Sequence, residues 1–237
     1  MGAAGGPRIP RDQLVLAVHA GSKKSYPGSG ADWQDLTQSK ITFSSYGTQT
    51  PFTTVSGVSC FDFNGSGYWE SDSGHGQVDM GGDCTLAFWM YAENLTERDT
   101  IFEKVGIGTN SYRQEIAVTL ETNEGFSYYS RKTPNYDYGS TGAMTQSAWN
   151  LMSIKMSTGK STTARTGFWS KNGSAYSANY TSRSNTAVET AGAIRIGTGY
   201  AGAVENGYIA SLYVYEKMLS DDEISTLYNS TKKKFGL

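Results

Sequence analysis

Two pairs of carboxylates are the residues in this sequence that could perform acid–base chemistry. Glycosidases use two such groups facing the same substrate bond, one as the acid and the other as the nucleophile or base. Glu70 and Asp72 have suitable alternate spacing, but they adjoin serine and glycine at the end of a short predicted strand. Glu121 and Glu124 are three residues apart, which places them on opposite faces of a strand. We interpret both pairs as solvated loop charges and expect no catalytic residue and no enzymatic activity.

Oxygen ligands for a metal ion are a second chemical possibility. Tight calcium sites need several oxygen ligands that converge from loops. Asp32, Asp35, Asp62 and Asn64 are possible donors, but no spacing singles them out, so metal binding stays open. The sequence has no phosphate-binding loop, nucleophile elbow or HExxH motif, and we expect no cofactor.

A tyrosine-rich segment, residues 128–142, is the best candidate for a binding surface. Its rings could stack on a sugar while its amide and carboxylate groups bind hydroxyls, and tyrosine-rich segments suit a protein interface equally well. The alternative is a strand and a twisted hairpin whose tyrosines only cover a sheet. The candidate ligand- or interface-binding residues are Tyr128, Tyr129, Arg131, Asn135, Tyr136, Asp137 and Tyr138.

Three other reactive side chains are assigned structural roles. His19 follows an apolar run, where a lone histidine is more often hydrogen-bonded in the core than a ligand. Cys60 and Cys84 each begin an apolar strand, and two cysteines are too few for a disulfide scaffold. We interpret them as buried small hydrophobic residues, and a disulfide between them stays open.

The elements that must position these residues are short strands. The chain of 237 residues contains 28 glycines, 16 tyrosines, 9 phenylalanines and 5 tryptophans, a composition typical of many strands joined by turns. Strands are predicted around 14–18, 61–63, 68–69, 84–91, 100–105, 114–120, 125–130, 149–155, 166–170, 193–197 and 207–215. Their number and spacing predict an all-β fold, a two-sheet antiparallel jelly-roll sandwich.

Local patterns refine this prediction. The strand at 84–91 is apolar on both faces and should be central in its sheet. Asn64 and Gly65 are typical turn residues and predict a hairpin between the strands on either side of them. Strand patterns also predict a core position for three tryptophans, Trp89, Trp149 and Trp169.

One helix is predicted, over residues 220–233. Ser220 stands three residues before Glu223, the spacing of a capping box, and an apolar face follows. We expect the helix to seal one edge of the sandwich. It ends in a basic run, residues 232–234, which suits the negative end of a helix dipole. The sandwich domain would then span 13–237.

Residues 1–12 form an expected N-terminal arm, because they are too rich in glycine and proline to build a core. An extended arm could lie along a neighbouring subunit and anchor it, or it could pack back on its own sandwich. The residues assigned to this assembly arm are Pro7, Arg8, Ile9, Pro10 and Arg11.

Charge and hydropathy argue against several function classes. A net charge of −2 and an isoelectric point of about 5.7 provide no basic face for nucleic acid. No apolar stretch approaches the ~20 residues of a membrane span, so we expect no membrane insertion. The opening residues also lack the apolar core of a signal peptide.

Sequence segments along nearly the whole chain resemble a known group of domains. LVLAVHAGSKKSYPGSGADWQDL at 14–36 and the last 31 residues, from GYIASLYVYEKMLSDDE onward, resemble the two ends of concanavalin-A-like, laminin-G-like domains frequent in tailed bacteriophages, especially marine ones. CFDFNGSGYWES, CTLAFWMYAEN, WNLMSIKMSTG and GFWSKNGSAYS are similar to the intervening strands. His19 is a departure, because the group usually has aspartate there.

The resemblance implies a non-enzymatic structural protein of a phage virion, either a head decoration or a tail or fibre component. Such a protein would assemble in the host cytoplasm, form a homo-oligomer, dock on other virion subunits of the capsid or tail, and could adhere to a cell-surface glycan. The alternative is a free or cell-surface carbohydrate-binding module. A glycoside hydrolase on the same fold is the third hypothesis.

Overall fold

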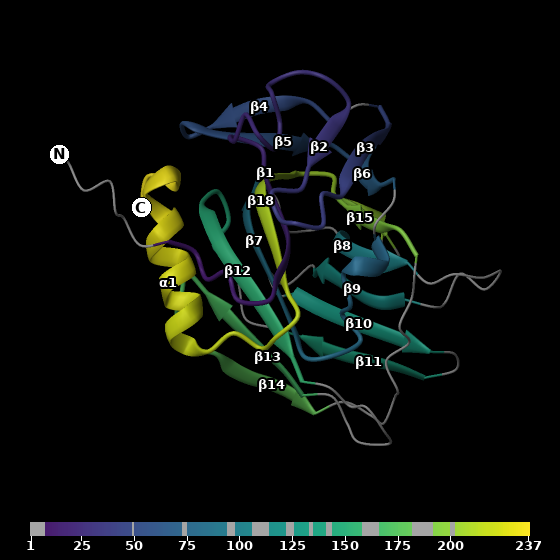
Figure 1. Cartoon of the computed structure of the whole chain (residues 1–237), viewed down its shortest axis with the longest axis vertical. Helices are drawn as coiled ribbons and strands as arrows, with labels where there is room; N and C mark the ends of the chain where they lie inside the picture. The colour runs from purple at the N-terminus through teal and green to yellow at the C-terminus, as the bar shows by residue number, and fades with distance from the viewer. Residues whose placement is uncertain are drawn as a thin grey trace.

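Two eight-stranded antiparallel sheets face each other, and one helix lies outside them (Figure 1). This computed structural model describes residues 8–48, 50–72, 75–93, 98–105, 114–121, 126–132, 135–140, 144–157, 166–181, 192–199 and 202–237. The predicted fold class, an antiparallel β-sandwich with a short C-terminal helix, is confirmed. No helix in the described ranges is long and apolar enough to cross a membrane.

The first sheet, called sheet A, has a buried central strand, as predicted. Its order is β14 (Ser177–Thr181), β13 (Thr166–Lys171), β12 (Trp149–Met156), β7 (Cys84–Ala92), β18 (Gly207–Tyr215), β5 (Val58–Phe63) and β4 (Phe52–Val55), and β1 (Leu14–His19) also pairs with β18. Both faces of β7 are apolar because both are covered, one by the opposite sheet and the other by the helix.

The second sheet, sheet B, contains the strands that carry the site described below. Its order is β11 (Asn135–Ser140), β10 (Phe126–Lys132), β9 (Gln114–Leu120), β8 (Asp99–Val105), β15 (Ile194–Ile196), β6 (Gly67–Ser71), β3 (Thr42–Gly47) and β2 (Asp32–Gln34). A two-stranded ribbon, β16 (Thr198–Gly199) and β17 (Gly202–Ala203), lies against β8. A short 3₁₀ turn, η1 (His75–Gln77), precedes β7.

An aromatic cluster fills part of the space between the sheets. The ring of Phe61 from sheet A lies 4.7 Å from Trp33 and 4.7 Å from Trp69 of sheet B, measured between centroids. All three side chains are fully buried. Aromatic pairs at such distances add to the free energy gained by burying their area, so this cluster helps to join β5 to β2 and β6.

The expected hairpin at Asn64 and Gly65 is wrong. The preceding strand, β5, pairs with β4 and β18 in sheet A, whereas the following strand, β6, pairs with β3 and β15 in sheet B. Gly65 has a φ of 79° and donates its N–H to the carbonyl of Val204. The turn residues are therefore used to pass the chain from one sheet to the other, and Phe61 and Trp69 meet across the core.

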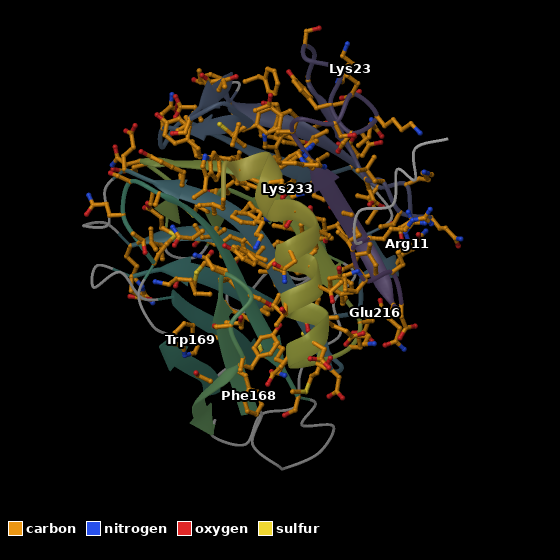
Figure 2. All side chains as sticks on the ribbon, turned by 90° about the vertical axis from the view of Figure 1, so that its left-hand side faces the viewer. Arg11, Lys23, Phe168, Trp169, Glu216 and Lys233 are labelled. Carbon is orange, nitrogen blue, oxygen red and sulfur yellow. The ribbon has the colours of Figure 1, made fainter. Side chains whose placement is uncertain are left out.

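Helix α1 (Asp221–Thr231) begins where the capping pattern predicts. Ser220 accepts a hydrogen bond from the N–H of Glu223, and the Glu223 carboxylate accepts one from the N–H of Ser220. Ile224 and Leu227 then pack against the middle strands of sheet A. The helix thus covers the outer face of sheet A, seen from the front in Figure 2, and does not seal an edge as expected.

The 3₁₀ turn η2 (Lys232–Phe235) continues this cover. Phe235 is buried in the same outer cluster as Trp89 and Trp149, two of the tryptophans predicted to be core, whereas the third, Trp169, is only partly buried. Cys60 and Cys84 are free, buried and on opposite faces of sheet A, which agrees with their interpretation as small hydrophobic residues.

Candidate functional site

The outer face of sheet B combines aromatic rings with charged groups. Successive residues of a strand point to opposite faces, and Trp69 of β6 is buried in the core. Its neighbours Tyr68 and Glu70 therefore face outward. On β3, Phe43 points into the core, so the alternate residues Ser44 and Tyr46 point to the same outer face as Tyr68 and Glu70.

Strand register aligns five polar residues across this face. Asp32 of β2 pairs with Ser44 of β3, and Ser44 pairs with Glu70 of β6. Arg195 of β15 then pairs with Glu70 on one side and with Glu103 of β8 on the other. The row therefore joins strands that are distant in sequence, and it contains three carboxylates and one guanidinium.

Two tyrosines form a platform beside this row. Tyr46 and Tyr68 are cross-strand partners, and their rings are stacked with centroids 5.5 Å apart and planes 12° apart. The guanidinium carbon of Arg195 lies 5.8 Å from the centroid of the Tyr68 ring. Tyr46 is 42% exposed, so a large part of this ring is available to a ligand.

Hydrogen bonds hold the charged groups in place. Arg195 Nε donates to Glu70 Oε2 at 2.5 Å. Burial opposes the charged form of Arg195, but the hydrogen bond and charge of Glu70 outweigh it and raise the pKa of the guanidinium. Ser44 Oγ donates to Asp72 Oδ2 at 2.9 Å, which places a further carboxylate beside the row. We call Ser44, Tyr46, Tyr68, Glu70, Asp72 and Arg195 the tyrosine face.

The β16–β17 ribbon limits this face on one side. Glu103 is only 4% exposed, although it belongs to the same row as Glu70 and Arg195. A Cβ atom added to Gly199 of β16 would lie 2.6 Å from Glu103 Oε2, so the ribbon backbone covers that carboxylate closely. The accessible groups are therefore those over β2, β3, β6 and β15.

The tyrosine face has the parts of a sugar-binding surface. An aromatic ring can cover the apolar face of a pyranose, and neighbouring side chains can fix its hydroxyl groups. Asp72 and Glu70 supply acceptors, Ser44 can donate or accept, and Arg195 supplies donors. Because both tyrosines sit on paired strands, the ring positions are held by the sheet.

The tyrosine-rich segment predicted from the sequence is the hairpin formed by β10 and β11. Backbone pairing places Tyr129 opposite Tyr138 and Arg131 opposite Tyr136. Tyr128, Asn135 and Asp137 lie on the same two strands, at the edge of sheet B opposite β2. The side chains of this segment are outside the described part of the structure, so their role as a binding surface stays a prediction.

The described part of the N-terminal arm contacts its own sandwich. Ile9 packs against the outer cluster of sheet A, and the carbonyl of Pro10 accepts a hydrogen bond from Tyr215 Oη at 3.2 Å. Figure 2 shows Arg11 to one side of α1. Arg8 is exposed and Pro7 lies outside the described residues. Anchoring of a neighbouring subunit by Pro7, Arg8, Ile9, Pro10 and Arg11 stays a prediction.

The carboxylates first considered for catalysis have structural partners. Glu70 and Asp72 share the tyrosine face, each with the partner given above. Glu121 forms an ion pair with Arg98 Nε at 3.1 Å, and Glu124 lies outside the described residues. We interpreted the first pair as solvated loop charges, but Glu70 is part of an ordered strand and a half-buried ion pair.

The possible calcium ligands are dispersed. Asp35 accepts hydrogen bonds from the N–H groups of Ala17 and Thr37, which ties β1 to the following loop. Asp62 lies on the outer face of sheet A and Asp32 on that of sheet B. Within the described ranges, no three side chains of His, Cys, Asp or Glu come together as metal ligands.

Sequence reasoning missed the tyrosine face, although part of its signal was present. In GYWES, alternation about the buried Trp69 could have predicted that Tyr68 and Glu70 point outward. Nothing local could have shown that Tyr46 and Arg195 lie beside them. That arrangement depends on the register of β3, β6 and β15.

Comparison with known proteins supports the fold. No protein-family model matches the sequence, and no curated protein matches it. Similar solved structures include the botulinum neurotoxin serotype C1 binding domain (TM-score 0.67, 12% identity) and Trypanosoma rangeli sialidase (TM-score 0.64, 15% identity). The binding domain of botulinum neurotoxin DC in complex with SialylT is similar as well (TM-score 0.64, 13% identity).

These neighbours are longer than this chain. The alignments with the two toxin domains cover 92% of this chain, and they cover 52% of the serotype C1 domain and 51% of the neurotoxin DC domain. The alignment with the sialidase covers 99% of this chain and 35% of the sialidase. The chain thus spans about half of the toxin domains and about a third of the sialidase. We expected no enzymatic activity for this chain, and that expectation is contradicted, because sialidases, which are enzymes, are among the solved structures that share its fold.

Proposed function

We propose that this chain is a carbohydrate-binding module whose ligand docks on the tyrosine face. The observation that carries the proposal is the exposed stack of Tyr46 on Tyr68, next to the hydrogen-bonding groups of Ser44, Asp72 and Arg195. Exposed aromatic rings on a rigid sheet lose little conformational freedom when a ligand covers them. Polar groups at the edge of the rings then orient the sugar.

The structural neighbours support the same class of ligand. A Trypanosoma rangeli sialidase of this fold is described in complex with sialic acid, and a botulinum neurotoxin binding domain in complex with SialylT. These ligands belong to those proteins. Complexes of this kind in proteins of the same fold favour the carbohydrate-binding hypothesis for this chain over a purely structural one. Because the identities are only 12–16%, the binding site is assigned from the residues of this chain alone.

Glycan-array binding followed by calorimetric titration tests the proposal. Tyr46→Ala and Tyr68→Ala should each weaken binding by roughly tenfold, the equivalent of one lost aromatic contact. Tyr208→Ala is a matched control, because Tyr208 also contacts a tyrosine, Tyr91, but on the outer face of sheet A. A folded wild-type protein that binds no glycan, or binding unaffected by both tyrosine variants, would overturn the proposal.

The same incubations can be examined for released sugar. Glu70 and Asp72 lie on one face of β6 and its end, so hydrolysis is the chemistry to check for alongside binding. Product release that is abolished by Glu70→Gln would assign a glycoside hydrolase. Binding without release would assign a module that only recognises its sugar.

The placement of this module on a phage virion, and its docking on capsid or tail subunits, remains the prediction of the sequence resemblance. A glycan-binding module on a tail or fibre would give the particle a means of adsorbing to a cell surface. Capsid or tail genes on both sides of the coding sequence would favour this placement. A cluster of polysaccharide-degradation genes would favour a cell-surface or free module.

A further inference from the structure

We infer that the tyrosine face binds a neutral sugar and discriminates against an anionic one. This inference rests on the proposed function and specifies its class of ligand. It comes from the charges of the face itself, and it separates this chain from neighbours that are described with sialic acid.

Negative charge predominates among the described residues of the tyrosine face and of the cross-strand row that runs through it. Asp32, Glu70 and Asp72 are carboxylates over β2, β6 and the end of β6, and Glu103 adds a covered carboxylate in the same row. Arg195 is the one cation within that described row. An anionic sugar docked on Tyr46 would approach an excess of like charge, and such charges repel at these short separations even in partly solvated surroundings.

Arg195 is poorly placed to compensate. Its Nε already donates to Glu70, and the positive charge is shared between Glu70 and Glu103, both of which raise the pKa of the guanidinium. Its Nη groups could still donate to a ligand carboxylate. One guanidinium that already neutralises Glu70 does not offset the neighbouring carboxylates Asp32 and Asp72, so a ligand carboxylate would still meet net negative charge.

A neutral sugar matches the same groups. Ionised carboxylates are acceptors only, and sugar hydroxyls are donors as well as acceptors. Asp72 already accepts one hydrogen bond from Ser44, and its exposed position leaves lone pairs for a hydroxyl. Hydroxyl groups can thus bind to Asp72 and Glu70 without breaking the pair between Glu70 and Arg195.

An array of matched oligosaccharides, with and without a terminal sialic acid, tests this inference. The neutral member of each pair should bind about tenfold more tightly near physiological salt, and the difference should shrink near 1 M salt because exposed charges are then screened. The double variant Asp32→Asn, Asp72→Asn should also reduce the difference. Asp222→Asn, an exposed residue of α1 on the other sheet, is the control and should leave it unchanged.

The outcomes separate the inference from the function on which it rests. Tighter binding of the sialylated members, lost in Tyr46→Ala, would overturn the inference and leave glycan binding at the tyrosine face intact. Equal binding of both members at all salt concentrations would overturn it too. Failure of the folded protein to bind any member of the array would overturn the proposed function as well.

Discussion

The rings of Trp89 and Phe235 lie face to face, with centroids 3.8 Å apart and planes 9° apart. Trp89 belongs to the central strand of sheet A, and Phe235 belongs to the last turn of the chain. Trp89 Nε1 also donates to Thr231 Oγ1 at 3.0 Å. One side chain of the sheet therefore holds both the helix and the segment that follows it.

Removal of the Phe235 ring should strongly destabilise the fold. Phe235→Ala deletes the stack on Trp89 and leaves a cavity beside Trp149, whose ring centroid is 5.2 Å away. We expect a loss of about 3–5 kcal/mol in the free energy of unfolding, measured by urea denaturation. Leu237→Ala is the control, since Leu237 is 51% exposed. Equal stability of the two variants would show that the stack contributes little.

The hydrogen bond from Trp89 can be tested by an isosteric change. Thr231→Val leaves the buried Trp89 N–H without its acceptor, which should cost about 1–3 kcal/mol. Thr50→Val is the matched control, because the Thr50 hydroxyl is buried and has no hydrogen-bond partner among the described residues. We expect that second change to be neutral or stabilising in the same denaturation experiment. A reversed order of the two effects would contradict this explanation.

The helix cap should contribute measurably to stability. Ser220→Ala removes the acceptor of the Glu223 N–H and breaks the capping box, at a cost of about 1 kcal/mol. Ser225→Ala, inside the same helix, should cost little, because the hydrogen bond that Ser225 accepts from Asn229 Nδ2 is solvent-exposed and alanine is the better helix former. Thermal unfolding of both variants compares the two positions. An unchanged midpoint for Ser220→Ala would count against the capping box.

His19 should make the protein less stable in acid. Burial and, to a smaller extent, the charge of Lys234 together lower its pKa to about 4, and Nδ1 accepts a hydrogen bond from the Gly21 N–H. The unfolded chain binds this proton near pH 6.5, so neutral His19 stabilises the fold above that pH, and the contribution is lost as the pH falls from 6.5 towards 4. The loss should reach up to about 3 kcal/mol.

Denaturation of the wild type and His19→Gln at several pH values measures this loss. The variant should lack the part of the pH dependence between 6.5 and 4 that His19 supplies, and it should match the wild type in slope above pH 7. Parallel curves for the two proteins over the acid range would show that His19 is not the group responsible.

The sequence was most informative where the signal is local. The helix start follows from Ser220 and Glu223, and the continuous apolar pattern at 84–91 identifies the central strand. The strand from Gly207 to Tyr215 was also predicted with its observed bounds. In each case, neighbouring residues determine the structure through capping, period-two alternation or burial on both faces.

Pairing between strands that are distant in the sequence could not be predicted from local patterns. The Asn64 and Gly65 turn is compatible with a hairpin or with a crossing, and only the partners of Phe61 and Trp69 decide between the two. The tyrosine face could not be predicted for the same reason, because the register of the paired strands, and not the spacing along the chain, brings its residues together. Arg195 in particular is separated from Glu70 by more than half of the sequence.

The pairing of β1 with β18 has a consequence for synthesis of the protein. The two strands stand at opposite ends of the sequence, and β18 also joins β7 to β5 in the middle of sheet A. A growing polypeptide therefore exposes β1, and a sheet A divided in two, until β18 has left the ribosome. Such long-range pairing slows folding and favours aggregation of incomplete chains. We expect chaperones that shield nascent chains to increase the yield of this protein.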